Sequence, residues 1–376
     1  MLEKKIKFSY RDVSIMPAEL STISSRSECN PFIQDNILPI FTAPMNSVVN
    51  ENNFSMFEEN GLIPILPRTV DIEKRLEKSK KYSWAAYSLA EFEKYFVEGD
   101  STGNVLIDIA NGHMEKLYQL VYQCKVEKED KVIIMVGNIA NPRTYEIVCE
   151  SGADFVRLGI GAGNGCITTS NVSIHYPMAS LISEVAGRRN YIADHYNIDK
   201  RTLPRIIADG GVRNYSDVIK ALALGADYVM IGSLLSRCIE GVGEKKIIDL
   251  LHPEIEPKVT VDPKELYDNL KYDWDNKYWR GLDKETGNEC NLDIQVKFYG
   301  MASKDGQIAL KGSKTTTSEG ITKYLPVQHT LSGWVNNMVD YLKSAMSYTN
   351  CRTIEEFIGG CTVVPYSPIT EDSINK

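Results

Sequence analysis

The chain has 376 residues, of which 43% are hydrophobic and 24% are charged, a composition typical of a globular protein with one large core. Its formal net charge of −8 argues against a nucleic-acid partner, although it leaves room for a local basic cleft that binds a phosphorylated small molecule. No apolar run approaches the roughly 18 residues of a membrane-spanning helix. The first residues, MLEKKIKFSYRD, lack the apolar core of a signal peptide. We therefore expect a cytoplasmic protein with no membrane partner.

Short apolar runs recur along the chain and predict eight strands that alternate with helices. Most are continuous rather than alternating, as expected for parallel strands that are covered on both faces. The runs are Pro39–Met45, Gly61–Leu66, Trp84–Leu89, Val105–Ala110, Val132–Asn138, Phe155–Ile160, Arg205–Gly211 and Tyr228–Ser233.

The segments between these runs include two clear helix candidates, His113–Cys124 and Tyr215–Gly225, the second of which ends at a glycine. Eight strand–helix units predict a single α/β domain over residues 1–376, folded as a TIM (β/α)8 barrel. An open doubly wound sheet would usually have fewer strands and a glycine-rich turn after the first one. Because loops after the strands build the active site of such barrels, we look for chemistry there.

The eight cysteines are scattered, with no C-x-x-C pair and no histidine at metal-ligand spacing, so we expect reduced thiols and no zinc site. Cys166 stands out because it lies in GIGAGNGCITTS, after the sixth predicted strand. A loop so rich in glycine can turn its amides and carbonyls inward and expose the thiol. We therefore interpret Cys166 as a nucleophile rather than an incidental buried cysteine.

The loops after the last two predicted strands also carry polar and glycine residues. ADGGVRN places Asp209 beside two glycines, and IGSLLS offers Gly232 and Ser233 at the start of a predicted helix. TIM barrels often build a phosphate site at these two loops. A carboxylate such as Asp209 suits ribose hydroxyls, because it accepts two hydrogen bonds.

Three segments make the chain similar to the family of IMP dehydrogenases and GMP reductases. They are GIGAGNGCIT, IADGGVRNYSDVIKALALGADYVMIGSLL, and FYGMAS at Phe298–Ser303. The resemblance covers most of the chain. It implies a TIM barrel with a mobile C-terminal active-site segment, a homotetramer, a nicotinamide cofactor, and a covalent bond between Cys166 and carbon 2 of a purine nucleotide.

Within that family, the sequence resembles the reductases more than the dehydrogenases. STISSRSE at Ser21–Glu28 and DIANGH at Asp108–His113 are similar to reductase segments. Dehydrogenases carry an Arg-Tyr pair on a flap, but residues 301–319 contain neither Arg nor Tyr. The resemblance thus implies NADPH-dependent reductive deamination of GMP to IMP and ammonia through a covalent Cys166 thioimidate.

The resemblance also implies roles for individual residues. Thr168 and Glu319 would act with Cys166 as catalytic residues that handle the proton of the leaving amine. Gly161, Gly163 and Cys166 would hold a monovalent cation, potassium, with oxygen ligands. Substrate-binding roles fall on Asn164, Asp209, Gly210, Gly211, Gly232, Ser233, Gly300, Met301, Ser318 and Gly320. Cofactor-binding roles fall on Ser25, Arg26, Arg68, Asp108, Ala110, Asn111 and Gly112.

The sequence departs from the family pattern at several positions. Asn164 stands in place of a phosphate-binding serine, Gly165 replaces a β-branched residue, and Thr315 and Thr316 replace a Tyr-Arg pair before Glu319. The stretch 246–295 is longer than the reductase connection, so we interpret it as an insertion after the eighth strand.

Three functions therefore stay open. The first is a GMP reductase that uses NADPH. The second is an IMP dehydrogenase that converts IMP and NAD to XMP with an unrecognised base. The third is a nucleotide-binding homologue, or one that acts on a modified or deoxy guanine nucleotide.

Overall fold

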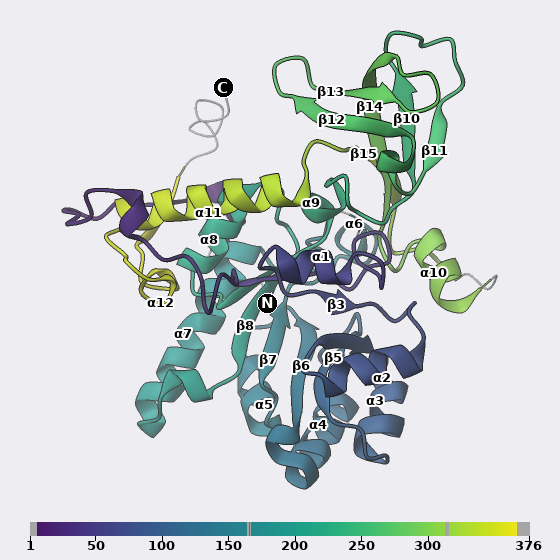
Figure 1. Cartoon of the computed structure of the whole chain (residues 1–376). Helices are drawn as coiled ribbons and strands as arrows, with labels where there is room; N and C mark the ends of the chain where they lie inside the picture. The colour runs from purple at the N-terminus through teal and green to yellow at the C-terminus, as the bar shows by residue number, and fades with distance from the viewer. Residues whose placement is uncertain (1–5, 164, 166, 313–315, 367–376) are drawn as a thin grey trace.

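The computed structural model describes residues 6–163, 165, 167–312 and 316–366. Its centre is an eight-stranded parallel sheet in the order β2-β9-β8-β7-β6-β5-β4-β3 (Figure 1). Each predicted run overlaps one of these strands, although β5 begins before its run and β6 ends after its run. The strands are β2 (Ile40–Thr42), β3 (Ile65–Leu66), β4 (Trp84–Tyr87), β5 (Gly103–Ile107), β6 (Val132–Ile139), β7 (Phe155–Leu158), β8 (Arg205–Asp209) and β9 (Tyr228–Ile231).

Hydrogen bonds between the two ends of this sheet close it into a barrel. The backbone N–H of Thr42 donates to the carbonyl of Ile63 at 3.0 Å, and the N–H of Ile63 donates to the carbonyl of Ile40 at 2.9 Å. The segment just before β3 therefore pairs with β2. This pairing confirms the predicted TIM barrel.

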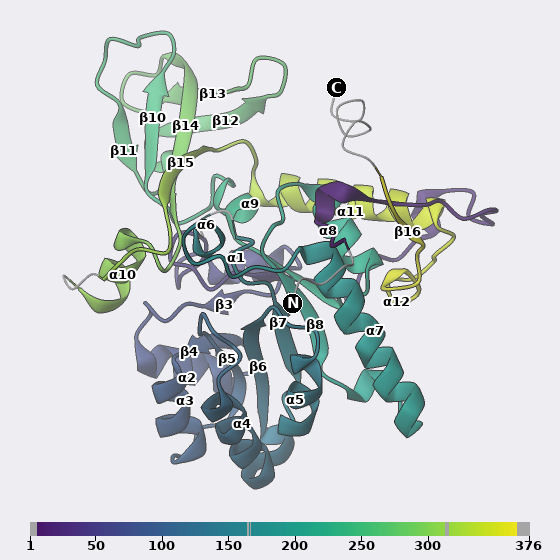
Figure 2. The same ribbon diagram turned by 180° about the vertical axis from the view of Figure 1, so that it is seen from behind.

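Helices cover the outside of the barrel (Figures 1 and 2). The predicted helix at His113–Cys124 is α4 (Glu115–Lys128), and the one at Tyr215–Gly225 is α8 (Tyr215–Ala223). The side chain of Asn214 caps α8 by accepting a hydrogen bond from the N–H of Asp217. The other helices are α1 (Phe54–Glu59), α2 (Ile72–Lys80), α3 (Leu89–Phe92), α5 (Thr144–Ser151), α6 (Thr168–Val172), α7 (Met178–Tyr196), α9 (Ser233–Ser236), α11 (Leu331–Tyr348) and α12 (Ile354–Phe357).

Aromatic side chains fill the barrel near the amino ends of its strands. Phe41, Trp84, Phe155 and Tyr228 form a closed ring, with centroids of successive side chains 5.1 to 5.7 Å apart. Three of them are the first residues of β4, β7 and β9. This packing closes one end of the barrel, so a ligand site belongs at the other end, where the strands finish.

Residues that follow β9 build a second, antiparallel sheet that stands beside the open end of the barrel (Figure 1). Its buried side chains form a separate cluster that includes Trp279, Leu292 and Ile294. The sheet extends from Lys245 to Pro326 and so reaches beyond residues 246–295, for which the sequence predicts an insertion. That this stretch is an insertion stays a prediction. The strands are β10 (Lys245–Asp249), β11 (Lys258–Thr260), β12 (Tyr267–Asp273), β13 (Tyr278–Asp283), β14 (Glu289–Tyr299) and β15 (Thr322–Pro326).

The segment between β14 and β15 extends away from this sheet, and the chain then returns to the sheet at β15. Tyr299 at the end of β14 pairs with Thr322 at the start of β15, so residues 300–321 form an excursion with a fixed base. The excursion includes α10 (Lys304–Lys311), whose first turn is capped by the side chain of Ser303. The antiparallel sheet therefore carries the FYGMAS segment and Glu319 together.

The two ends of the described chain also meet. β1 (Val13–Ile15) pairs antiparallel with β16 (Val363–Pro365), next to α8. Among the helices of the described residues, none has the length and apolar character needed to cross a membrane.

Candidate active site

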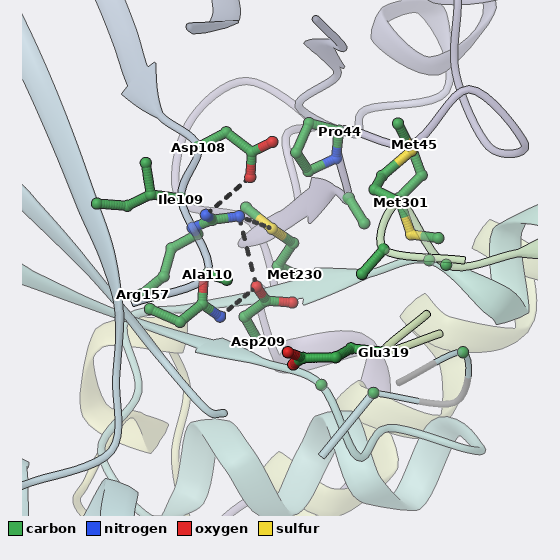
Figure 3. Close-up of a pocket in the computed structure, with 18 of the residues that line it drawn as sticks. Pro44, Met45, Asp108, Ile109, Ala110, Arg157, Asp209, Met230, Met301 and Glu319 are labelled. Atoms are coloured by element: carbon green, nitrogen blue, oxygen red, sulfur yellow. Dashed lines mark hydrogen bonds and ion pairs between the residues drawn. The ribbon is translucent and has the colours of Figure 1, made fainter. Parts of the chain in front are cut away.

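A cavity of about 510 Å³ opens where the barrel strands end (Figure 3). Its wall comes from Asn138 of β6, from the loops after β2, β3, β5, β7, β8 and β9, and from the excursion between β14 and β15. The barrel and the antiparallel sheet therefore share one pocket.

Arg157 lines the pocket and lies between two carboxylates, Asp108 and Asp209 (Figure 3). Its Nη2 donates to Asp108 Oδ1 at 3.1 Å, and its Nη1 lies 3.5 Å from Asp209 Oδ2. The side chain of Arg157 is only 4% exposed. Because a buried cation needs paired anions, Arg157 fixes the positions of Asp108 after β5 and Asp209 at the end of β8.

Asn138, near the end of β6, supports Asp209 at the end of β8. Its side-chain amide donates to Asp209 Oδ2 and to the carbonyl of Gly159, both at 2.8 Å. Burial raises the pKa of Asp209, while Arg157 and Asn138 oppose this rise and the charge of Asp108 adds to it. Asp209 is thus an oriented acceptor at the wall of the pocket.

Thr168 and Glu319 form a second polar pair at the pocket. Thr168, the first residue of α6, donates from Oγ1 to Glu319 Oε2 at 2.9 Å. The backbone N–H of Ile167 donates to the carbonyl of Glu319 at 2.9 Å. The carboxylate of Glu319 is therefore held against the loop that follows β7 and contains position 166.

Glycines let the same loop approach the FYGMAS segment closely. The N–H of Ile321 donates to the carbonyl of Gly165 at 3.0 Å. A Cβ on Gly165 would lie 2.9 Å from the backbone nitrogen of Gly300, and a Cβ on Gly300 would lie 2.5 Å from the carbonyl oxygen of Gly165. Both positions need glycine, because the neighbouring atoms are backbone and cannot turn away.

Comparison with known proteins agrees with this geometry. The family model described as "IMP dehydrogenase / GMP reductase domain" matches residues 94–250. The GMP reductase of Helicobacter pylori (strain ATCC 700392 / 26695) is 30% identical over 257 residues, which cover 64% of this chain and 74% of the relative. The chain belongs to the IMP dehydrogenase/GMP reductase family.

Two further relatives show how far the similarity extends. The GMP reductase of Staphylococcus saprophyticus is 29% identical over 256 residues, 64% of this chain and 74% of the relative. The GMP reductase of Vibrio vulnificus (strain YJ016) is 26% identical over 386 residues, 96% of this chain and 95% of the relative. This family membership makes the chain an oxidoreductase.

The structure brings together most of the residues that the family resemblance singles out. Thr168 contacts Glu319, and Gly320 packs against Ser303 and Gly165. Ser318 donates to the carbonyl of Gly320 at 2.6 Å. Asn164 and Cys166 lie outside the described residues. The predicted residues that line the pocket are Arg68, Asp108, Ala110, Gly163, Asp209, Gly210, Gly211, Gly232, Ser233, Gly300, Met301 and Glu319.

Other predicted residues lie away from the pocket wall. Asn111 accepts a hydrogen bond from the N–H of His113, and Gly112 packs against the backbone of Asn138. Ser25 caps a short 3-10 helix, and Arg26 pairs with Asp340 on α11 at 3.4 Å. Any role of Ser25 and Arg26 in binding the cofactor stays a prediction.

The donor of Arg68 and the carboxylate acceptor of Asp108 fit the carboxamide of the nicotinamide cofactor that the family implies. Arg68 Nε lies 3.2 Å from Asp108 Oδ2, yet it is buried and has no hydrogen-bond partner among the described residues. A buried donor beside a carboxylate acceptor suits a carboxamide, which offers both an acceptor oxygen and an N–H donor.

The loop after β8 lines the pocket with two glycines. Gly210 and Gly211 adopt φ angles of +99° and +76°, and a Cβ on Gly210 would lie 3.1 Å from the backbone nitrogen of Gly163. The predicted cation site is less complete in the described residues. The carbonyl of Gly161 accepts a hydrogen bond from Thr169 Oγ1 at 2.8 Å, and Cys166 lies outside them. The potassium ion therefore stays a prediction.

Sequence analysis missed Arg157, Asn138 and Gln307, although all three line the pocket. Arg157 had a usable signal, because a charged residue inside the apolar run FVRLGI must find a partner when the strand is buried. The sequence gives no comparable signal for Gln307, because a glutamine in a predicted helix is usually an ordinary surface residue.

Proposed function

We propose that this chain is a GMP reductase, which converts GMP, NADPH and two protons to IMP, ammonium and NADP⁺. The observation that carries the proposal is the 2.9 Å hydrogen bond between Thr168 and Glu319 at the pocket, beside the loop that holds Cys166. Nucleophile, hydroxyl and carboxylate are the groups that reductive deamination needs.

In this mechanism the Cys166 thiolate adds to carbon 2 of GMP, and ammonia leaves to give a thioimidate. An amine leaves poorly unless it is protonated, so Glu319 would supply a proton through Thr168 or directly to the departing nitrogen. NADPH, when bound, would supply the hydride that reduces carbon 2. The carbon–sulfur bond then breaks, which releases IMP and restores the Cys166 thiolate. Arg68 and Asp108 would orient its carboxamide, and Asp209 would bind the ribose of GMP.

An IMP dehydrogenase that forms XMP is the second candidate, supported by the family description. That reaction needs a base to activate water. The absence of Arg and Tyr from the sequence of residues 301–319 favours the reductase over this alternative. A homologue that binds nucleotide without turnover has no need for both Cys166 and Glu319.

The test is purified protein with GMP and NADPH in potassium buffer, with absorbance at 340 nm and ammonia followed together. Loss of NADPH with matching ammonia supports the proposal. Gain of absorbance with IMP and NAD identifies the dehydrogenase instead, and nucleotide binding without either change identifies a binding protein. A deoxy or modified guanine nucleotide that outpaces GMP would revise the substrate. The homotetramer and the cytoplasmic location stay predictions.

A further inference from the structure

Glu319 lies near the end of a long excursion from the antiparallel sheet. Its position against Thr168 therefore depends on interactions within the excursion. The base of the excursion is fixed by the pairing of Tyr299 with Thr322. Inside the excursion, Gln307 on α10 is a buried polar side chain, only 7% exposed. A buried carboxamide is costly unless its donors and its acceptor are all used.

The Gln307 side chain forms hydrogen bonds with residues near both the start and the end of the excursion. Its Nε2 donates to the carbonyl of Ala302 at 3.1 Å and lies 3.5 Å from the carbonyls of Thr316 and Thr317. Its Oε1 accepts from the N–H of Thr316 at 2.6 Å and from the Thr316 hydroxyl at 3.2 Å. The carboxamide thus ties the start of the excursion to the residues just before Glu319.

The carbonyl of Ala302 connects this tie to Glu319 itself. It accepts hydrogen bonds from Gln307 Nε2 at 3.1 Å and from the N–H of Glu319 at 3.2 Å. A continuous set of hydrogen bonds therefore runs from Gln307 through Ala302 to Glu319 and on to Thr168.

We propose that Gln307 is a positioning residue, which acts through Ala302 and Thr316 to hold the Glu319 carboxylate at its reactive place. This inference rests on the proposed acid–base role of Glu319. No other uncharged side chain of this length offers two donors and an acceptor together. A displacement of about 1 Å at a reacting group can cost up to about a hundredfold in rate.

Substitution of Gln307 should leave the fold intact, because α10 has anchors of its own. Ser303 caps the helix, and Asp305 bonds to both Lys297 of β14, at 3.0 Å, and Thr322 of β15. Ile308, the next residue of α10, is 51% exposed and is absent from the pocket wall. It provides a matched control position on the same helix.

The experiment compares wild type with Gln307→Met, Gln307→Glu and the control Ile308→Ala. Methionine keeps the length but forms no strong hydrogen bond, and glutamate keeps the acceptor but turns a carboxylate oxygen toward the three carbonyls. Amide hydrogen exchange of residues 316–321 should speed up in both Gln307 variants and not in Ile308→Ala, with the barrel unchanged. Unaltered exchange at 316–321 would overturn the proposal.

The kinetic arm distinguishes positioning from a general loss of stability. Gln307→Met should lower kcat by about ten- to a hundredfold, with KM for GMP changed less than about threefold. In a Glu319→Gln background, the same substitution should cost less than about twofold, because the group that it positions is already gone. Additive losses, or a loss confined to KM, would refute positioning. If wild type lacks GMP reductase activity, the proposed function fails, while hydrogen exchange still tests the tie itself.

Discussion

Thr168 and Glu319 are 151 residues apart in the chain, yet the Thr168 hydroxyl donates to a Glu319 carboxylate oxygen at 2.9 Å. Thr168 belongs to the barrel, and Glu319 arrives on an excursion from the antiparallel sheet. The contact therefore joins two structural units at one pocket. Its chemistry depends on the docking of the sheet as well as on the two residues.

Glu319→Gln should separate proton transfer from binding. Glutamine still accepts a hydrogen bond from Thr168, so the local structure should persist, but it cannot protonate a leaving amine. We expect kcat to fall by about a hundredfold or more, with KM for GMP changed only a fewfold. Steady-state kinetics of both parameters provides the check. Equal effects on kcat and KM would make Glu319 a binding residue.

Cys166→Ala should abolish turnover and preserve nucleotide binding. The covalent step has no alternative nucleophile assigned to it, whereas the residues proposed to bind GMP lie in the loops after β8 and β9 and are unchanged in the variant. Calorimetric titration with GMP, alongside NADPH consumption, measures both properties. Appreciable residual turnover would remove the covalent bond from the mechanism. Cys290→Ala, in the core of the antiparallel sheet, serves as the matched control and should keep turnover.

Arg157→Met should destabilise the barrel strongly. It leaves Asp108 and Asp209 without the buried cation that lies within 3.1 and 3.5 Å of them. Removal of one partner from a buried ion pair costs about 3 to 5 kcal/mol. Urea unfolding, compared with the control Arg201→Gln at an exposed ion pair, checks this expectation. Equal unfolding midpoints for the two variants would show that the barrel does not depend on Arg157.

His329 should make stability depend on pH at the junction between sheet and barrel. It lies 5.0 Å from Trp274 of the sheet and 6.3 Å from Tyr215 of α8, between ring centroids. Burial, with a smaller contribution from Arg237, lowers the pKa of His329 from 6.5 to about 4. Between these values the unfolded chain binds more protons than the folded one, so this contribution is present above pH 6.5 and is lost as the pH falls.

His329→Phe keeps an aromatic ring and removes the titration. From pH 7 to pH 4, wild type should lose about 2 kcal/mol more of its free energy of unfolding than the variant loses. Denaturant unfolding at several pH values measures this difference. Parallel pH profiles for the two proteins would contradict the assignment to His329.

The sequence alone determined the barrel. Its strands are continuous apolar runs, such as Val132–Asn138, whose local pattern survives folding because both faces are buried. The same pattern located the polar loops of Asp209 and Gly232, because the ends of parallel strands gather at one face of a barrel. Thr168 and Glu319 were found by family resemblance, since neither has a distinctive local pattern.

Only the tertiary structure decided how these pieces meet. The sequence of residues 246–295 predicts an insertion, but the pairing of this stretch into a sheet depends on long-range contacts such as that between Lys246 and Gln295. The partners of Arg157 and Gln307 are likewise distant or backbone groups that no spacing reveals. Local patterns fix helices and strands, whereas buried hydrogen bonds and ion pairs arise from the packing of segments far apart in the chain.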